Sequence, residues 1–569
     1  MTRISLFRTK TLKMNKKWSY VLTAILAFGL LNIQWATEPA CASEKPYIIV
    51  GKNTPLMGWA SWNNFRANIS ETILKAQVDG MVKTGLQKAG YRYFNIEDGF
   101  FAGRDDLGNL ITDRVKFPKG MKDMADYIHS KGLKAGIYSE AGSNTCGSIW
   151  DAQKGGINAG MYTRDQKDVN LFFKTWGFDY IKVDYCGGQK QALDEQERYT
   201  AIKNAIIATG RKDIQYNVCR WEFPGTWVLP VANSWRISHD LFLRWSSVIE
   251  AIDKNTFLAA YASAGHYNDM DMLQVGRGFT ADEDKAHFTL WAILSSPLLL
   301  GNDLTQINDY TLSIITNEEI IALNQDTTGL QAQLVRDNGK GLQVFAKALN
   351  GKQSNERAVV LFNRNNQPQT ITFSLNDINL YGPATLRDLW RKADLGQLTD
   401  SYTTEVPAHG VVALKIKGKN KLKEIFEGET AFLNNFNHLK YSRAIPEQAR
   451  AERDSSCSGL AKAARVGNNL DNWMEFRDII APASGRYSMN ITYLCSEDKT
   501  LHIKTNDDKP QAIKALNSGG PDKTATISIP VFLQKGQNKV RFFNNNAYIP
   551  DIDKISFAFL LSRSSSKSK

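Results

Sequence analysis

The sequence predicts an α/β chain in which a (β/α)8 barrel is followed by an antiparallel β domain and a further β-rich region. Between Pro55 and Asp303, eight short β-rich runs alternate with helix-length segments. After Asn324 the pattern changes to short alternating runs without a long helical stretch. The chain has 569 residues, too many for one ordinary hydrophobic core, so two or three domains are expected.

The eight predicted strands alternate with segments that suit helices, and this alternation is typical of a parallel barrel. The helix-compatible segments include Glu71–Lys88, Gly120–Ser130 and Gln166–Trp176. Several of the β-rich runs end in acidic or aromatic residues, and the carboxyl ends of barrel strands are where catalytic residues gather. The predicted strands are Met57–Trp62, Tyr91–Asp98, Gly132–Glu140, Phe178–Tyr185, Ile214–Trp221, Ser234–Asp240, His266–Leu273 and Leu298–Asp303.

Changes in pattern divide the chain into six expected segments. These are an amino-terminal leader at 1–42, the barrel at 43–324, the antiparallel β domain at 325–417, a linker at 418–426, the last β-rich domain at 427–560 and a basic tail at 561–569.

The amino-terminal segment has the three parts of a secretory signal peptide. Six basic residues precede an apolar run from Val21 to Leu31, and the small-residue site Ala40-Cys41-Ala42 follows. The run is shorter than the ~20 residues that a membrane-spanning helix needs. The sequence therefore predicts an exported protein of the periplasm or the extracellular space, without a membrane span. Lipid attachment at Cys41 is the alternative, which the residues before it disfavour.

The formal net charge of +12 does not indicate a nucleic-acid-binding protein. Residues 1–42 carry six positive charges and one negative charge, so their removal leaves +7. Much of the remainder lies in the lysines between Lys415 and Lys423 and in the basic tail, a pattern more typical of solvated segments.

Two predicted strands carry carboxylates at their ends. In Tyr180–Cys186, alternation places Lys182 and Asp184 on the same face, toward the barrel mouth. The segment Ser234–Asp240 ends in a second acid and contains Arg236. A single lysine–aspartate pair is more often a structural ion pair, but acids at the ends of two strands are what a glycosidase requires.

The chain resembles glycoside hydrolase family 27, the α-galactosidase and α-N-acetylgalactosaminidase family. The resemblance covers about residues 53 to 415 and includes these stretches in order: Met57–Trp62, Ile96–Asp98, Phe117–Met121, Gly136–Ser139, Lys182–Asp184, Ser234–Arg236 and Asn268–Leu273.

The resemblance implies a retaining double displacement, with Asp184 as nucleophile and Asp240 as acid and then base. It implies that Lys182 and Arg236 bind ring hydroxyls, that Asp98 holds the axial 4-hydroxyl and that Trp62 packs on the sugar. Cys146 and Cys186 resemble the pair that forms the family's active-site disulfide. Further expected substrate contacts are Glu97, Tyr138, Cys219, Arg220, Trp221 and Asp271. No metal ion and no cofactor are expected, because no His, Cys and carboxylate cluster has metal-ligand spacing.

The chemistry of these residues predicts their protonation states. Lys182 and Arg236 close to Asp184 favour its ionised form, as a nucleophile requires. Repulsion from ionised Asp184 is expected to raise the pKa of Asp240, so that it starts as an acid. Cys219, from its own chemistry, is expected to be a small buried hydrophobic group.

Three departures from the family pattern affect the expected specificity. Glu97-Asp98-Gly99 replaces the usual Asp-Asp-Cys, and the longer carboxylate would fill the space of the sugar's 6-hydroxymethyl group. This predicts a preference for β-L-arabinopyranosides, with an ordinary α-D-galactosidase as the alternative. Arg220 replaces a common Glu near the 2-substituent, and Glu140 replaces a common Asp for no reason that the sequence offers.

The last β-rich domain resembles the β-sandwich carbohydrate-binding modules of the galactose-binding-like class. Trp473 is as compatible with a core position as with sugar stacking, and Cys457 and Cys495 are candidates for a disulfide. The expected partner of the whole chain is an oligo- or polysaccharide with terminal galactose or arabinopyranose. A sugar-binding protein without catalytic activity is the rival function, which the survival of both acids disfavours.

Overall fold

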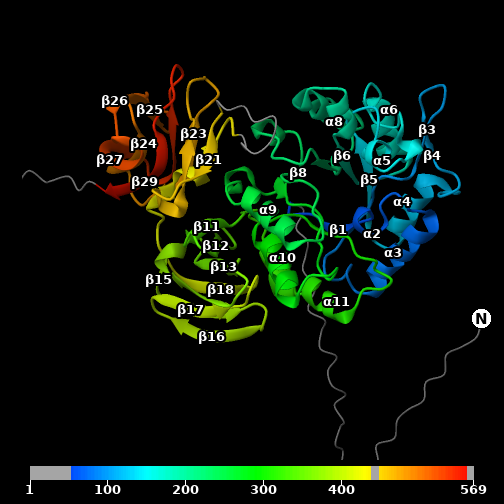
Figure 1. Cartoon of the computed structure of the whole chain (residues 1–569), viewed down its shortest axis with the longest axis horizontal. Helices are drawn as coiled ribbons and strands as arrows, with labels where there is room; N and C mark the ends of the chain where they lie inside the picture. Colours follow the sequence, from blue (N-terminus) through cyan, green and yellow to red (C-terminus); the bar gives the residue numbers. More distant parts are fainter. Residues whose placement is uncertain (1–52, 437–447, 560–569) are drawn as a thin grey trace, which may run out of the picture. The chain divides into compact units, whose positions relative to one another are not determined.

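A computed structural model describes residues 53–436 and 448–559 of the chain (Figure 1). The predicted signal peptide, Cys41 and the basic tail at 561–569 lie outside these residues. Within the described residues, no helix combines the length and apolar character that crossing a membrane would require.

Eight parallel strands form the first sheet, in the order β10-β1-β2-β5-β6-β7-β8-β9. A parallel bridge between Leu273, just after β9, and Leu300 in β10 joins the two ends, so the sheet closes into the predicted barrel. All eight predicted strands are present but shorter than expected. The strands are β1 (Met57–Ala60), β2 (Tyr93–Ile96), β5 (Lys134–Glu140), β6 (Tyr180–Asp184), β7 (Gln215–Val218), β8 (Ser234–Arg236), β9 (Tyr267–Asp269) and β10 (Leu298–Leu300).

Helices follow most of the barrel strands, and side-chain caps fix where several of them begin. Ser70 caps α3, Asp194 caps α8, and Thr280 with Glu283 forms a capping box on α10. The predicted helix at Gln166–Trp176 is α6 followed by a π-helical turn at Leu171–Thr175. The helices are α2 (Trp62–Phe65), α3 (Glu71–Lys83), α4 (Gly120–Ser130), α5 (Cys146–Trp150), α6 (Asp165–Asn170), α7 (Cys186–Lys190), α8 (Glu195–Ala208), α9 (Trp245–Asn255), α10 (Ala281–Ile293), α11 (Asp309–Ile315) and α12 (Glu318–Asn324).

Large side chains fill the barrel and the layer under its helices. Trp59, Phe94, Ile137, Trp235 and Trp291 belong to one cluster of buried residues. This packing makes the strands a rigid support for the loops at their carboxyl ends. The sequence pattern did not predict the short hairpin of β3 (Phe101–Arg104) and β4 (Leu110–Thr112).

The second region is antiparallel, as predicted. Its six-stranded sheet has the order β11-β12-β13-β18-β15-β16, and β14 pairs with β17. Strand β18 continues to Asn420, because Lys419 and Asn420 pair with Tyr381 and Leu380 of β15. The expected linker at 418–426 therefore begins inside a strand. The strands are β11 (Gln333–Asp337), β12 (Leu342–Ala348), β13 (Glu356–Asn363), β14 (Gln369–Ser374), β15 (Leu380–Asp388), β16 (Ala393–Leu398), β17 (Ser401–Val406) and β18 (Val411–Asn420).

The last region contains two antiparallel sheets, in the orders β21-β22-β29-β24-β27 and β20-β23-β28-β25-β26, with β19 paired to β29. Cys457 and Cys495 are buried free thiols, so the candidate disulfide between them does not form. The strands are β19 (Ile425–Glu427), β20 (Phe432–Leu433), β21 (Arg450–Arg453), β22 (Ala461–Ala464), β23 (Met474–Ala481), β24 (Gly485–Cys495), β25 (Lys499–Thr505), β26 (Gln511–Leu516), β27 (Gly520–Leu533), β28 (Gly536–Phe543) and β29 (Asp551–Phe559).

Candidate active site

The carboxyl ends of four barrel strands bring most of the predicted site residues to one place. Lys182 and Asp184 lie on β6, Tyr138 on β5 and Arg236 on β8, while Asp98 follows β2. All except Lys182 are buried, and Lys182 is largely so. The strand alternation that predicted a shared direction for Lys182 and Asp184 explains this gathering.

Lys182 is the cation at the centre of this group. Its Nζ lies 3.0 Å from Oε1 of Glu97. Burial alone would lower the pKa of Lys182, but the charges of Asp184 and Glu97 outweigh burial and raise it well above its ordinary value. Lys182 is therefore a permanent positive charge beside two carboxylates.

The pKa of Asp184 is raised above its ordinary value, mainly by burial. The charge of Lys182 acts in the opposite direction, as the sequence predicted, and the charge of Asp240 adds to the increase. Oδ1 of Asp184 is buried without a hydrogen-bond partner among the described residues. Such an atom is costly to bury unless a ligand completes its bonding.

Asp240 has the opposite electrostatic character to the one predicted. Nη2 of Arg236 lies 3.1 Å from its Oδ1, and 55% of the Asp240 side chain is exposed. Burial raises the pKa of Asp240, but the charges of Arg236 and Lys182 outweigh it and hold the pKa below its ordinary range. The prediction that Asp184 raises this pKa is wrong for the sugar-free enzyme, because it left out the guanidinium in contact with Asp240.

Asp271 contacts both Arg236 and the loop that carries Asp240. Nη1 of Arg236 is 3.1 Å from Oδ1 of Asp271, and the backbone N–H of Leu241 donates to Oδ2 at 2.7 Å. Asp271 has φ of 83°, in the left-handed region that non-glycine residues rarely adopt. These contacts place Asp271 as a support for Arg236 and for the loop that carries Asp240.

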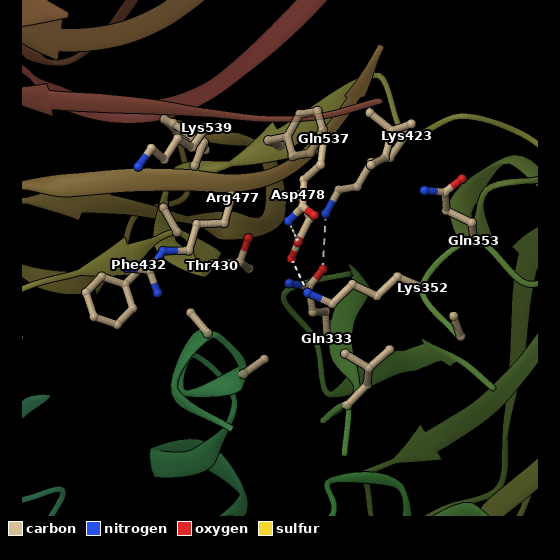
Figure 2. Close-up of a pocket in the computed structure, with 18 of the residues that line it drawn as sticks. Gln333, Lys352, Gln353, Lys423, Thr430, Phe432, Arg477, Asp478, Gln537 and Lys539 are labelled. Atoms are coloured by element: carbon tan, nitrogen blue, oxygen red, sulfur yellow. Dashed lines mark hydrogen bonds and ion pairs between the residues drawn. The ribbon is translucent and has the colours of Figure 1, made fainter. Parts of the chain in front are cut away.

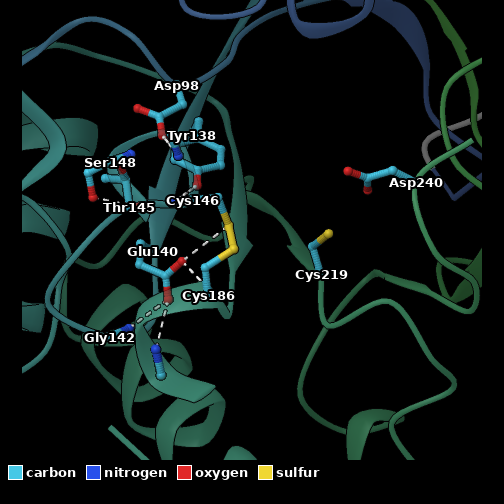
Figure 3. Close-up of a disulfide and its surroundings, with 12 residues drawn as sticks. Asp98, Tyr138, Glu140, Gly142, Thr145, Cys146, Ser148, Cys186, Cys219 and Asp240 are labelled. Atoms are coloured by element: carbon cyan, nitrogen blue, oxygen red, sulfur yellow. Dashed lines mark hydrogen bonds between the residues drawn. A yellow bond between two sulfur atoms is a disulfide. The ribbon is translucent and has the colours of Figure 1, made fainter. Parts of the chain in front are cut away.

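Asp98 and Tyr138 are held by the loop that follows β5 (Figure 3). The N–H of Gly147 donates to Oδ2 of Asp98 at 2.8 Å, and the N–H of Cys146 donates to Oη of Tyr138 at 3.3 Å. Burial raises the pKa of Asp98 to about 6. The predicted disulfide between Cys146 and Cys186 is present, with 5.1 Å between the Cα atoms.

Glu97 is buried at the start of the same loop as Asp98. Burial raises its pKa to about 7, against the opposing charge of Lys182. Its N–H donates to Oγ of Ser61 at 3.0 Å, which fixes the backbone, and its carboxylate turns toward Lys182. The extra methylene of Glu97, relative to Asp, thus extends the reach of the carboxylate toward a cation.

The segment Cys219–Trp221, which was expected to contact the substrate, directly follows β7. The guanidinium of Arg220 pairs with Glu195 and Glu222, the latter at 3.2 Å. Its charge is therefore compensated within the protein. Cys219 is buried, with Sγ 3.6 Å from Nη1 of Arg236, as expected for a small buried side chain beside the site.

Trp62 lies at the first turn after β1, where it was expected to pack on the sugar. The guanidinium of Arg66 is 4.9 Å from the centre of its ring and pairs with Asp151. Arg66 thus already covers one face of the Trp62 ring.

Glu140 is a buried residue of this region to which the sequence assigned no role. It lies at the end of β5, directly opposite Asp184 in the register of β6. The only signal in the sequence was the departure from the common Ser-Asp pair.

A separate pocket of about 1390 Å³ lies elsewhere in the structure (Figure 2). Its lining includes Lys423, Gln333 and an ion pair of 2.6 Å between Lys352 and Asp478. None of the predicted catalytic or sugar-binding residues lines it.

Comparisons with known proteins agree with the geometry of the barrel. Residues 54–326 match the family described as "Alpha galactosidase A", and residues 339–416 match the "Alpha galactosidase C-terminal beta sandwich domain". An α-galactosidase of Oryza sativa subsp. japonica is 41% identical over 357 residues, which are 61% of this chain and 82% of the relative.

Two solved structures are similar to about two thirds of the chain. Alpha-galactosidase I from Mortierella vinacea is 33% identical, with a TM-score of 0.59 over 65% of this chain and 98% of that chain. A β-L-arabinopyranosidase variant from Geobacillus stearothermophilus, in complex with arabinose, is 26% identical, with a TM-score of 0.56 over 64% of this chain and 97% of that chain.

Proposed function

Because the chain belongs to glycoside hydrolase family 27, the α-galactosidase family, we propose that it is an exo-acting, retaining α-D-galactosidase. The observation that carries the proposal is the group of Lys182, Asp184, Asp98 and Arg236 at the carboxyl ends of the barrel strands, beside Asp240. This group combines two carboxylates for chemistry with charged partners for vicinal hydroxyls.

In the proposed reaction, Asp184 attacks the anomeric carbon while Asp240 donates a proton to the glycosidic oxygen. The bond to the leaving group breaks, and a galactosyl ester of Asp184 forms. Asp240, now a carboxylate, then removes a proton from water, which attacks the same carbon and releases galactose of retained configuration. The partner-free Oδ1 of Asp184 supports its role as the attacking group.

Asp240 must be protonated in the first step, and the free enzyme holds its pKa low. We infer that the bound sugar changes this state. A sugar that engages Arg236 and excludes water from the half-exposed Asp240 weakens the contact that favours the carboxylate. Asp240 then becomes an acid in the complex, where the proton is needed.

The galactoside is favoured over the β-L-arabinopyranoside as the main substrate. The named relatives reported above are mostly α-galactosidases, and the arabinopyranosidase is a more distant relative. The contact between Glu97 and Lys182 supports the same choice, because it directs the longer carboxylate at the lysine. The arabinopyranoside preference expected from the length of Glu97 is not supported by these findings.

The proposed substrates are oligo- or polysaccharides with terminal α-galactose. The pattern of residues 1–42 supports export, and the resemblance of residues 427–560 to carbohydrate-binding modules supports a sugar-binding role for that domain.

The test is release of nitrophenol from p-nitrophenyl α-D-galactopyranoside and p-nitrophenyl β-L-arabinopyranoside, measured side by side. The proposal requires a higher kcat/KM on the galactoside. A higher value on the arabinopyranoside would restore the pentose hypothesis, and no release from either would favour a sugar-binding protein.

A further inference from the structure

Glu140 is fully buried and takes no part in the proposed reaction, yet it lies next to its centre. It ends strand β5, and its backbone is in register with Asp184 on β6. The N–H of Ala141 donates to the carbonyl oxygen of Asp184 at 2.9 Å, so the two strand ends are also joined through the main chain.

The carboxylate of Glu140 accepts three backbone hydrogen bonds (Figure 3). Oε1 accepts from the N–H groups of Gly142 at 2.9 Å and Gly188 at 3.2 Å, and Oε2 accepts from the N–H of Cys186 at 3.0 Å. Gly142 belongs to the loop after β5, whereas Cys186 and Gly188 belong to the segment after β6. One side chain thus joins the two segments that leave the neighbouring strand ends.

The backbones of these two segments lie so close together that a side chain at Gly142 or Gly187 would not fit. A Cβ on Gly142 would lie 2.1 Å from the carbonyl carbon of Gly187, and a Cβ on Gly187 would lie 2.5 Å from the oxygen of Asn144. Buried N–H groups need partners, and here one carboxylate supplies them.

Both segments carry groups that the proposed reaction uses. Asp184 precedes Cys186 by two residues, and the loop after β5 supplies the N–H of Gly147 that holds Asp98. The disulfide between Cys146 and Cys186 also links the segments, and Sγ of Cys146 lies 3.7 Å from Oε2 of Glu140. A displacement of either segment would therefore move the nucleophile relative to the group that holds the sugar.

We propose that Glu140 is a positioning residue, whose carboxylate fixes the segment after Asp184 against the loop that holds Asp98. The proposal rests on the proposed galactosidase function and explains the Glu in place of the common Asp. The longer side chain reaches N–H groups on a neighbouring element as well as on its own loop. A metal site is not the role of this cluster, since the sulfurs of Cys146 and Cys186 are bonded to each other.

The experiment compares Glu140→Gln, Glu140→Asp and the wild type on p-nitrophenyl α-D-galactopyranoside. A galactose-configured cyclitol epoxide, which esterifies the nucleophile, counts the competent active sites, and kcat is expressed per labelled site. The amide of Gln places an NH2 group, which is a donor, opposite backbone N–H donors. It therefore cannot accept all three hydrogen bonds. The expected result is a loss of kcat per labelled site on the order of 10²-fold, the cost of a misplacement of about 1 Å.

The kinetic pattern distinguishes positioning from general stability. For Glu140→Gln, kcat and kcat/KM are expected to fall together, as for an interaction that acts in the transition state. Glu140→Asp keeps the charge and is expected to recover part of the loss. The matched control is Asp179→Asn, a buried carboxylate at the opposite end of β6 that accepts the N–H of Ala135 at 3.0 Å. It is expected to lower Tm and to keep kcat per labelled site.

Three results would overturn the proposal: wild-type kcat per labelled site in Glu140→Gln, a loss of activity accounted for entirely by unlabelled protein, or an equal per-site loss in Asp179→Asn. If Glu140→Gln does not fold, Glu140→Asp alone decides, because a per-site kcat equal to that of the wild type would also contradict positioning. Failure of the galactosidase function itself would appear separately, as a wild type without turnover.

Discussion

Nζ of Lys182 lies 3.0 Å from Oε1 of Glu97, and this ion pair is largely buried between β2 and β6 in the barrel mouth. The pair explains how a longer carboxylate is accommodated where the family commonly has Asp. Glu97 extends toward Lys182, which also interacts electrostatically with Asp184. Both the extra length and the negative charge of Glu97 therefore contribute to this ion pair.

The first prediction concerns the substrate preference set by Glu97. We expect Glu97→Asp to weaken the contact with Lys182 and to lower kcat/KM on the α-D-galactoside and the β-L-arabinopyranoside alike. Their ratio should stay within about threefold, below the tenfold or greater change that a methylene filling a pocket gives. A shift of tenfold or more toward the galactoside would mean that Glu97 does occupy the hydroxymethyl space.

The second prediction concerns the pH dependence of turnover. The pKa of Asp240 is low in the free enzyme because of Arg236, and we propose that bound sugar raises it. The pH profile of kcat/KM reports the free enzyme and that of kcat reports the complex. The alkaline limb of kcat/KM should therefore lie at a lower pH than that of kcat. Coincident limbs would show that the sugar leaves this pKa unchanged.

The third prediction concerns stability. Burial raises the folded-state pKa of Glu97 to about 7. This carboxyl group then binds its proton more tightly in the folded chain, so the stabilisation is complete below pH ~4.5 and is lost as pH rises through the folded-state value. It contributes a slope of at most ~1.4 kcal/mol per pH unit.

Calorimetry should show Tm falling between pH 5 and pH 8. In Glu97→Gln this fall should be smaller, because the substituted side chain no longer titrates. A Tm that rises over this range, or an unchanged slope in the variant, would contradict the assignment.

The sequence predicted the barrel well because the information lies in local patterns. Each of the eight strands has a buried β-rich run, and alternation along β6 placed Lys182 and Asp184 on one side. The resemblance to the family predicted the disulfide between Cys146 and Cys186, which the spacing of the cysteines along the chain does not predict by itself. These features depend on single elements or on motifs that remain recognisable.

The features that the sequence missed depend on contacts between distant elements. The low pKa of Asp240 follows from Arg236 on β8, and the compensated charge of Arg220 follows from Glu195 on α8 and Glu222. Glu140 was visible only as a departure from the family pattern, because its three donors come from the loop after β5 and from helix α7. Such contacts are set by loop conformation, for which the sequence has no periodic signal.

The fourth prediction concerns the two proposed catalytic carboxylates. Asp184→Asn and Asp240→Asn should each lower kcat on the α-galactoside, by on the order of 10⁴-fold for the nucleophile. Circular dichroism should show an unchanged fold, because both changes preserve side-chain size. Asp179→Asn, at the far end of β6, provides the control for loss of a buried carboxylate, and a comparable loss of activity there would argue against a specific role.

The most direct test of the account is the product that Asp240→Ala forms when azide is added. In this variant the galactosyl ester of Asp184 still forms from an activated substrate such as p-nitrophenyl α-D-galactopyranoside, but water is no longer activated by a base. Azide needs no base and should attack from the face that water uses. The expected product is an α-galactosyl azide, of the same configuration as the substrate, identified by NMR. A β-galactosyl azide would show a single displacement at the anomeric carbon and would contradict the assignment of Asp184 as nucleophile and Asp240 as acid and base.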